Sequence, residues 1–187
     1  MIRCRAGEEV RREGGALGAL TVEGPCRVVV RGVQFTGDRE KSPAGQGLPP
    51  SDVRFVDHFR AGNGLVVIGS AEVVVEGATF SGYAAFPVLA SGVGKIRISR
   101  CRFRDSGSRN GKGRNNTTGG VLLEDGTANF VVEDSTFVNI LGNGVWTHSR
   151  YLHVRNGPGV IQRNTFDTIA RDAVQVGHAA RVEVSDE

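Results

Sequence analysis

Two histidines in the C-terminal part of the chain, His148 and His178, have the chemistry needed to move a proton. Arg150 follows the first of them and Arg171 precedes the second. A neutral imidazole can remove or return a proton near neutral pH, and a guanidinium group can stabilise negative charge that develops on a reacting group. These residue types predict a site for proton abstraction, in which a histidine is the base and an arginine stabilises the charge.

Other side chains close to these histidines could bind a ligand. Trp146, the only tryptophan, precedes the first histidine by two residues, and Gln175 precedes the second by three. An exposed indole ring could stack on a flat ligand; the alternative is that the segment 149–158 covers it. Glu124 and Asp125 could tune the pKa of a histidine or hydrogen-bond the ligand.

The same residues also have simpler interpretations. Both histidines could be solvated residues in turns. Glu124 and Asp125 could bind Ca²⁺ through hard oxygen ligands, but two acidic residues do not fill the six or more positions that this ion takes. Cys4, Cys26 and Cys101 are odd in number and lack a metal-binding spacing such as Cys-x-x-Cys. We therefore predict no metal site and no cofactor, with calcium as the alternative, and we expect Cys101 to be a small buried residue.

A basic segment could contribute from outside this group. Arg109 and Arg114 lie within residues 104–119, which read RDSGSRNGKGRNNTTG. Glycine, asparagine and charged residues in this density predict a mobile surface loop. Such a loop could overhang a groove and bind carboxylates through its arginines, or it could simply be solvated.

A repeat of phenylalanines indicates the elements that must position these side chains. Intervals of 20, 25, 23, 34 and 29 residues separate Phe35, Phe55, Phe80, Phe103, Phe137 and Phe166. The positions five and seven residues before most of these phenylalanines are apolar, an alternation that predicts a strand with one buried face. Repeats of 20 to 50 residues with strand-like content are typical of solenoids.

A second family of strands follows the phenylalanines and carries the candidate site. Its members are expected at 64–68, 86–89, 120–124, 144–148 and 173–176. Alternation that directs Val145 and Thr147 inward directs Trp146 and His148 outward. Because adjacent coils lie about 4.8 Å apart, outward side chains on successive coils are expected to converge on one face.

The coils VVEDSTFVNILGNGVWTHS and VIQRNTFDTIARDAVQVGH resemble those of the right-handed parallel β-helix, or pectate-lyase-like, superfamily. The resemblance extends from residue 28 to the C-terminus and is least regular between residues 35 and 64. We therefore predict an all-β chain, a right-handed parallel β-helix solenoid of about six coils. Residues 26–187 form the coils, and residues 1–25 are an irregular segment or a partial first coil.

The resemblance implies a carbohydrate-directed function, with the second strand family and its bordering loops as the saccharide groove. We expect a lyase or epimerase that acts on an acidic polysaccharide; a glycoside hydrolase is a further enzymatic possibility. The alternative is a non-catalytic glycan-binding, adhesin or tailspike-like β-helix. The chain lacks the aspartate pair of polygalacturonase-like hydrolases, and Gly177-His178-Ala179 only approximates their Gly-His-Gly motif.

The composition limits the other classes of partner. The net charge of +3 is mild, and its basic residues are spread along the chain rather than grouped for nucleic-acid binding. No apolar run is long enough for a membrane span. No apolar signal-peptide core follows Met1, so the localisation stays open: extracellular or periplasmic if a leader precedes this sequence, cytoplasmic otherwise.

The last residues of the chain resemble an unfinished coil. Residues 180–187 read ARVEVSDE, the front half of a repeat without its phenylalanine. A solenoid needs an atypical element over its last coil, because open strand edges pair with other strands. We therefore expect a fragment or an uncapped C-terminal coil, and self-association through the uncapped ends.

Overall fold

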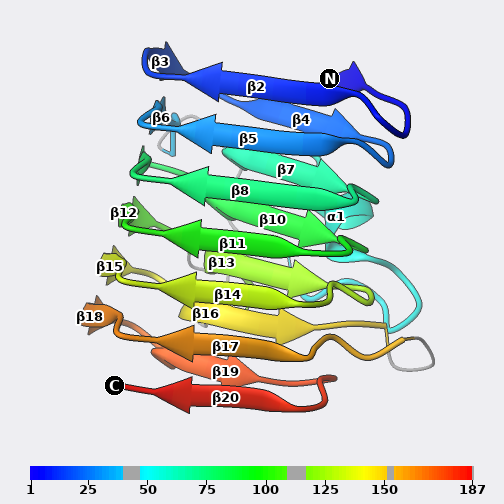
Figure 1. The fold of residues 1–187 in the computed structure, drawn as a ribbon. Coiled ribbons are helices and arrows are strands. Elements are labelled where there is room, and N and C mark those ends of the chain that lie inside the picture. The colour runs from blue at the N-terminus through cyan, green and yellow to red at the C-terminus, as the bar shows by residue number, and fades with distance from the viewer. Residues whose placement is uncertain (40–46, 109–116, 151–153, 187) are drawn as a thin grey trace.

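A computed structural model describes residues 1–39, 47–108, 117–150 and 154–186 of the chain. The described residues form three parallel sheets that wind together as a solenoid (Figure 1). Each turn of the chain places one strand in sheet A, one in sheet B and one in sheet C, in that order. The predicted all-β parallel β-helix is confirmed.

The strand boundaries follow this order through the chain. Sheet A holds β1 (Ile2–Arg3), β4 (Leu20–Glu23), β7 (Leu65–Ile68), β10 (Val88–Ser91), β13 (Gly119–Glu124), β16 (Asn143–His148) and β19 (Val174–Val176). Sheet B holds β2 (Glu9–Glu13), β5 (Arg27–Arg31), β8 (Glu72–Glu76), β11 (Ile96–Ser99), β14 (Phe130–Glu133), β17 (Gly159–Gln162) and β20 (Val182–Ser185). Sheet C holds β3 (Ala16–Leu17), β6 (Gln34–Thr36), β9 (Thr79–Ser81), β12 (Arg102–Ser106), β15 (Thr136–Ile140) and β18 (Thr165–Ile169).

A column of stacked phenylalanine rings runs through the inside of the solenoid. Successive ring centroids are 4.6, 5.0, 4.6 and 4.9 Å apart in the order Phe35, Phe80, Phe103, Phe137, Phe166. All but the last are fully buried, and the strand register pairs each with the next. The predicted register is therefore confirmed, because these rings can stack only if every coil presents its phenylalanine at the same place.

The sharp bend between sheets B and C is built from a ladder of small residues. The Cys101 amide donates to Ser135 Oγ at 3.1 Å, and the Ser135 amide donates to Asn164 Oδ1 at 3.0 Å. The residues just before them, Arg100 and Asp134, have positive φ angles of 53° and 49°. Only compact side chains fit where three successive bends stack, as the repeat predicted, and Cys101 is buried as expected.

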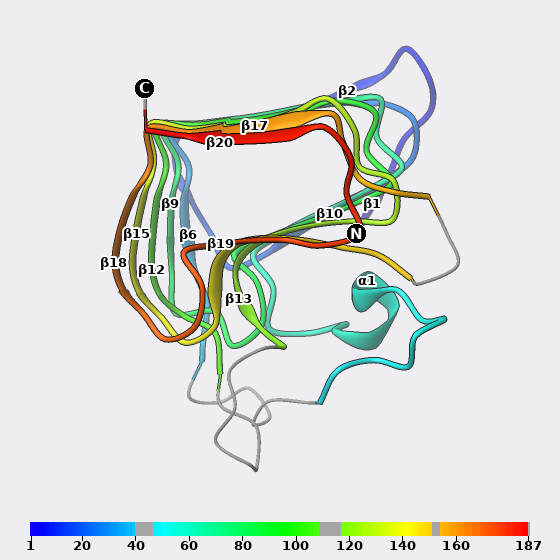
Figure 2. The same cartoon turned by 90° about the horizontal axis from the view of Figure 1, so that it is seen from below.

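Phe55 does not belong to the ring column, so its place in the sequence repeat is misleading. It begins the single described helix, α1 (Phe55–His58). Figure 2 shows α1 outside the coil, beside the outer face of sheet A. The segment 47–62, which we call the strap, leaves the solenoid after β6 and returns at β7. The alternating apolar strand that precedes every ring in the column is missing before Phe55.

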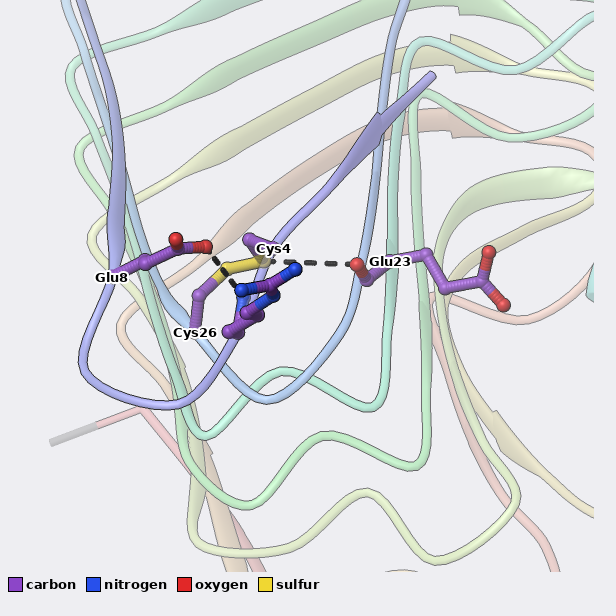
Figure 3. The surroundings of a disulfide bond; sticks show 5 residues. Cys4, Glu8, Glu23 and Cys26 are labelled. Carbon is purple, nitrogen blue, oxygen red and sulfur yellow. Dashed lines mark hydrogen bonds between the residues drawn. A yellow bond between two sulfur atoms is a disulfide. The ribbon is translucent and has the colours of Figure 1, made fainter.

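Residues 1–25 hold four short strands, β1 to β4, so the coils begin at residue 2. A disulfide joins Cys4, which follows β1, to Cys26, which precedes β5 (Figure 3). Its Cα atoms are 5.7 Å apart, and the two cysteines are 22 residues apart in the sequence. This pair was not predicted from the sequence, although its separation is close to the shortest repeat intervals and so places the cysteines one coil apart.

The last coil leaves apolar side chains in contact with solvent. Val176 on β19 and Val184 on β20 are 47% and 53% exposed. The self-association expected through this end stays a prediction. The described helix α1 spans four residues and is far too short to cross a membrane.

Candidate functional site

The outer face of sheet A brings the predicted site residues into adjacent rows. Leu122 pairs with Trp146, which pairs with Gln175, and Glu124 pairs with His148 one row further along. The register therefore places these side chains in neighbouring rows of one sheet, and the backbone rather than any loop sets their spacing.

The two histidines meet side by side on this face. Nδ1 of His148 lies 3.0 Å from Nδ1 of His178. The Ser149 amide donates to Nδ1 of His178 at 3.3 Å, so that nitrogen is an acceptor. The hydrogen-bond pattern therefore assigns the shared proton to Nδ1 of His148, and Nε2 of His148 becomes its lone-pair nitrogen.

The surroundings keep this pair neutral. Burial lowers the pKa of His148 to about 4, with a further contribution from His178. Burial also lowers the pKa of His178, and the charge of Arg155 adds to that effect. Both rings are therefore uncharged near neutral pH, the state in which an imidazole accepts a proton. Neither Glu124 nor Asp125, which were predicted to tune a histidine, is among the causes of these two pKa shifts.

A shallow pocket of about 260 Å³ opens beside the pair, and its lining comprises Leu48, Trp146, His148, Arg171, Gln175, Gly177 and His178. Nε of Arg171 lies 3.4 Å from a carboxylate oxygen of the exposed Asp172, a loose contact. Oε1 of Gln175 accepts a hydrogen bond from Asn143 at 2.7 Å, which orients the amide and leaves its NH₂ group as the donor. The pocket thus combines neutral bases, a cation and an amide donor.

Trp146 differs from the expectation of an exposed ring. It is only 5% exposed, and the expected stacking platform is absent. The strap covers it: the ring of Phe55 meets Trp146 edge to face at 5.1 Å, and Phe59 and Phe86 complete the same apolar cluster. The alternative cover, residues 149–158, includes residues 151–153, which lie outside the described residues. Trp146 therefore forms part of the pocket wall and anchors the strap.

Glu124 anchors the other side of the strap. It is 1% exposed, and its carboxylate oxygens accept hydrogen bonds from the amides of Phe55 and Val56 at 2.7 and 3.0 Å. Burial raises the pKa of Glu124 to about 7, and these amide bonds oppose the rise. The side chain holds α1 against sheet A and does not line the pocket.

Asp125 and Arg150 form an ion pair with each other. The Arg150 guanidinium donates to both carboxylate oxygens of Asp125, each at 2.9 Å. Arg150 is therefore a structural partner here, and Arg171 is the arginine that reaches the pocket. Because Glu124 is bound by amides and Asp125 by a guanidinium, this acidic pair does not fit a Ca²⁺ site. No cluster of three or more metal-ligating side chains occurs within the described ranges.

The two loop arginines predicted to overhang the groove, Arg109 and Arg114, lie outside the described residues. Their contribution to a site stays a prediction.

The sequence analysis missed Asn156, which holds the backbone beneath the histidine pair. This side chain is 1% exposed and donates to the carbonyl of His148 at 2.9 Å and to Ser149 Oγ at 3.0 Å. Its Oδ1 accepts hydrogen bonds from two amides of the preceding coil, Gly126 and Thr127. Asn156 lies ten residues before Phe166, as Thr127 does before Phe137, so the repeat could have placed it at this corner but could not indicate which groups it binds. The strap did leave one signal, because Phe55 and Phe59 are four residues apart on one helical face.

Comparison with protein families gives a match to the right-handed β-helix region over residues 51–187. The chain belongs to this family. The match covers residues 51–62 of the strap, the histidine pair and every coil from β7 onward. Neither curated proteins nor solved structures gave a match to this β-helix. Family membership fixes the fold, and the activity must be argued from the site.

Proposed function

We propose that this β-helix binds an acidic polysaccharide at the pocket on sheet A and acts on it as a lyase, with the histidine pair as the proton-transfer group. The observation that carries the proposal is the 3.0 Å contact between His148 and His178 in a pocket that Arg171 also lines. A uronate needs a base beside its carboxylate and a cation on that carboxylate, and this pocket supplies both.

The arrangement assigns a role to each group. Nε2 of His148 takes the proton from the carbon next to the uronate carboxylate. The electron pair of that C–H bond forms a carbon–carbon double bond, the bond to the glycosidic oxygen breaks, and water protonates the departing oxygen. The hydroxide that remains takes the proton from His148, which returns to its neutral form. Arg171 pairs with the carboxylate while it gains charge. Nδ1 of His178 accepts a hydrogen bond from the Nδ1–H group of His148 and so stabilises the imidazolium that forms on His148.

Elimination fits this geometry better than epimerisation. An epimerase must return a proton to the opposite face of the sugar ring, which needs a second group on the far side. The two histidines lie in direct contact on one wall, so they serve one face. We therefore favour the lyase over the epimerase that the resemblance also allows.

The test is to incubate the protein with oligomers of galacturonate, mannuronate or guluronate and follow ultraviolet absorption. A lyase produces an unsaturated end that absorbs, and His148→Ala should abolish the signal while binding stays nearly unchanged. His58→Gln is the matched control, because His58 lies in the strap and contacts Gly47 and Phe59 rather than the pair. New reducing ends without absorption would indicate a hydrolase and contradict the proposal.

A non-catalytic glycan-binding β-helix is the second candidate. The strap already occupies Trp146 and Glu124, so much of the outer face of sheet A is covered by the chain itself. A weak saccharide binder, adhesin or tailspike-like stalk needs only the remaining polar pocket. Oligosaccharide binding with no unsaturated and no reducing product would support this reading.

We also infer that the chain works in an oxidising compartment. The disulfide between Cys4 and Cys26 joins two successive turns, and such bonds persist mainly in exported proteins. Export would also suit an extracellular polysaccharide as the partner. Thiol titration of the denatured protein as purified from its native host should find one free cysteine, Cys101; three free cysteines would contradict this inference.

A further inference from the structure

The outer face of sheet C carries arginines in a setting unlike that of sheet B. On sheet B, guanidinium groups alternate with carboxylates across neighbouring coils. Arg27, for example, contacts Glu9 at 2.7 Å and Glu72 at 2.9 Å. Ion pairs of this kind are made by Arg11, Arg27, Arg31, Arg97, Arg100 and Arg163. The positive charges on the outer face of sheet B are therefore balanced by neighbouring carboxylates.

Sheet C presents two arginines that lack such neutralisation. Arg102 and Arg104 are two residues apart on β12, so both project from the same face, and both are exposed. Within the described ranges, Arg102 makes no ion pair. Arg104 reaches only the exposed Asp105, at 3.6 Å. Asp105 also accepts a hydrogen bond from Asn139 at 2.7 Å.

A hollow lies beside these two arginines. Its volume is about 210 Å³, and its other lining residues are Gln34, Thr79, Phe80 and Ser81. The register aligns Gln34, Thr79 and Arg102 in one row across three coils. Hydroxyl and amide groups therefore stand next to two cations, and no carboxylate lines the hollow.

We propose that this hollow is a second saccharide subsite, which binds the carboxylate of an acidic sugar between Arg102 and Arg104. A guanidinium group binds a carboxylate through two parallel hydrogen bonds. Thr79, Ser81 and Gln34 supply neutral donors and acceptors for the sugar hydroxyls. The choice of a uronate rests on the proposed function, whereas the anion-binding character rests on the arginines alone.

The register limits where the ligand lies. In the row of Arg104, the next coil carries Val138 and the following one carries Asp167, a carboxylate that repels an anion. The favourable part of the face therefore extends from β12 toward β9 and β6. A chain bound there occupies a face of the solenoid different from that of the histidine pair, so this subsite would hold a long polymer rather than react with it.

The test is nuclear magnetic resonance titration of the whole chain with a galacturonate hexamer, with neutral cellohexaose as the control ligand. We expect amide shifts at Thr79, Ser81, Arg102 and Arg104 with the acidic hexamer only. The double variant Arg102→Ala/Arg104→Ala should weaken binding at these amides about five- to thirty-fold, the effect of removing two exposed charge-assisted contacts.

A matched variant separates this site from non-specific attraction. Arg3→Ala/Lys95→Ala also removes two positive charges, from exposed side chains away from sheet C, and should leave binding unchanged. An equal loss in both variants, or no shifts on sheet C, would overturn the subsite. Shifts on sheet C without any unsaturated product would retain the subsite and reject the lyase. Unsaturated product without shifts on sheet C would retain the lyase and reject the subsite.

Discussion

The interior of the coils and the outer face of sheet A are built by opposite means. Inside, each coil repeats the same side chain at the same place, so Phe80 stacks on Phe103 and Phe103 on Phe137 at 4.6 to 5.0 Å. Outside, the packing against Trp146 comes from the strap, which occurs once in the chain. Repetition makes the core and sets the spacing of the site residues, and a single excursion of the chain covers one side of that site.

The difference predicts two kinds of response to change. A defect inside the column affects several coils at once, because each ring contacts the ring before and the ring after it. A defect under the strap can be relieved by local opening, because the coils beneath have their own hydrogen bonds. Defects in the column should therefore lower the global free energy of unfolding. Defects under the strap should instead be detected by local probes such as the fluorescence of Trp146.

Phe137→Ala should have the largest effect. Phe137 is fully buried between two stacked rings, and its loss removes apolar burial and leaves a cavity. We expect a loss of about 3–5 kcal/mol in the free energy of unfolding, measured by urea denaturation. The control is Val138→Ala, a neighbouring residue that is 40% exposed. Similar losses for the two variants would contradict the column as the source of stability.

The pH dependence of the free energy of unfolding should show the next largest effect, because burial beneath the strap shifts the pKa values of Glu124 and His148. Burial raises the pKa of Glu124 from 4.5 to about 7, so its contribution to stability is present below pH 4.5 and is lost as the pH rises through 7. The shift corresponds to about 3 kcal/mol. Burial lowers the pKa of His148 from 6.5 to about 4, which acts in the opposite direction: stability is lost as the pH falls from 6.5 toward 4.

Two variants separate these opposing contributions. Glu124→Gln should leave only the histidine effect, with stability that rises between pH 4 and 6.5. His148→Gln should remove the larger histidine contribution and leave the glutamate effect dominant over the smaller one of His178, with stability that falls as the pH rises to 7. Denaturation at a series of pH values measures both. Identical pH profiles for Glu124→Gln and the unmodified chain would show that this carboxyl is not buried as described.

Phe55→Ala should have a smaller and more local effect. The ring packs on Trp146 and on His148, each at 5.1 Å, but it lies at the edge of the molecule, where the strap can readjust. We expect a loss of about 1.5–3 kcal/mol, the transfer free energy without a rigid cavity. The emission of Trp146 should shift to longer wavelength as water reaches the indole. Unchanged emission would mean that other groups cover the ring.

Lys95→Ala should have the smallest effect. Nζ of Lys95 lies 3.6 Å from Glu72 on the exposed face of sheet B, and its side chain is 64% exposed. Solvent and salt screen such a pair, so we expect a change of about 0.5 kcal/mol or less in urea denaturation. A loss above 2 kcal/mol would show that the charge ladder of sheet B supports the coils as strongly as the column does.

The repeat allowed the coils to be predicted and left the strap unpredicted. Val145 and Trp146 were assigned to opposite faces from alternation alone, and the register agrees. Their coil positions placed His148 and His178 near one face, but the direct contact between their rings was not predicted. What lies over Trp146 could not follow, because the covering residues come from a non-periodic segment about 90 residues earlier in the chain. The contacts of Glu124 and Asp125 could not be predicted for the same reason, because their partners, the amides of α1 and the Arg150 guanidinium, follow no repeat.

The corner between sheets C and A has an architectural consequence. Between β9 and β10 the chain turns this corner in a few residues, whereas between β6 and β7 it makes the excursion that contains α1. Both routes deliver the next strand to the same register, since β7 and β10 pair along their full length. The corner therefore accepts connections of different length while the register of the coils stays unchanged. Exchanging the segment at this corner would alter what covers the outer face of sheet A and leave the coils beneath it as they are.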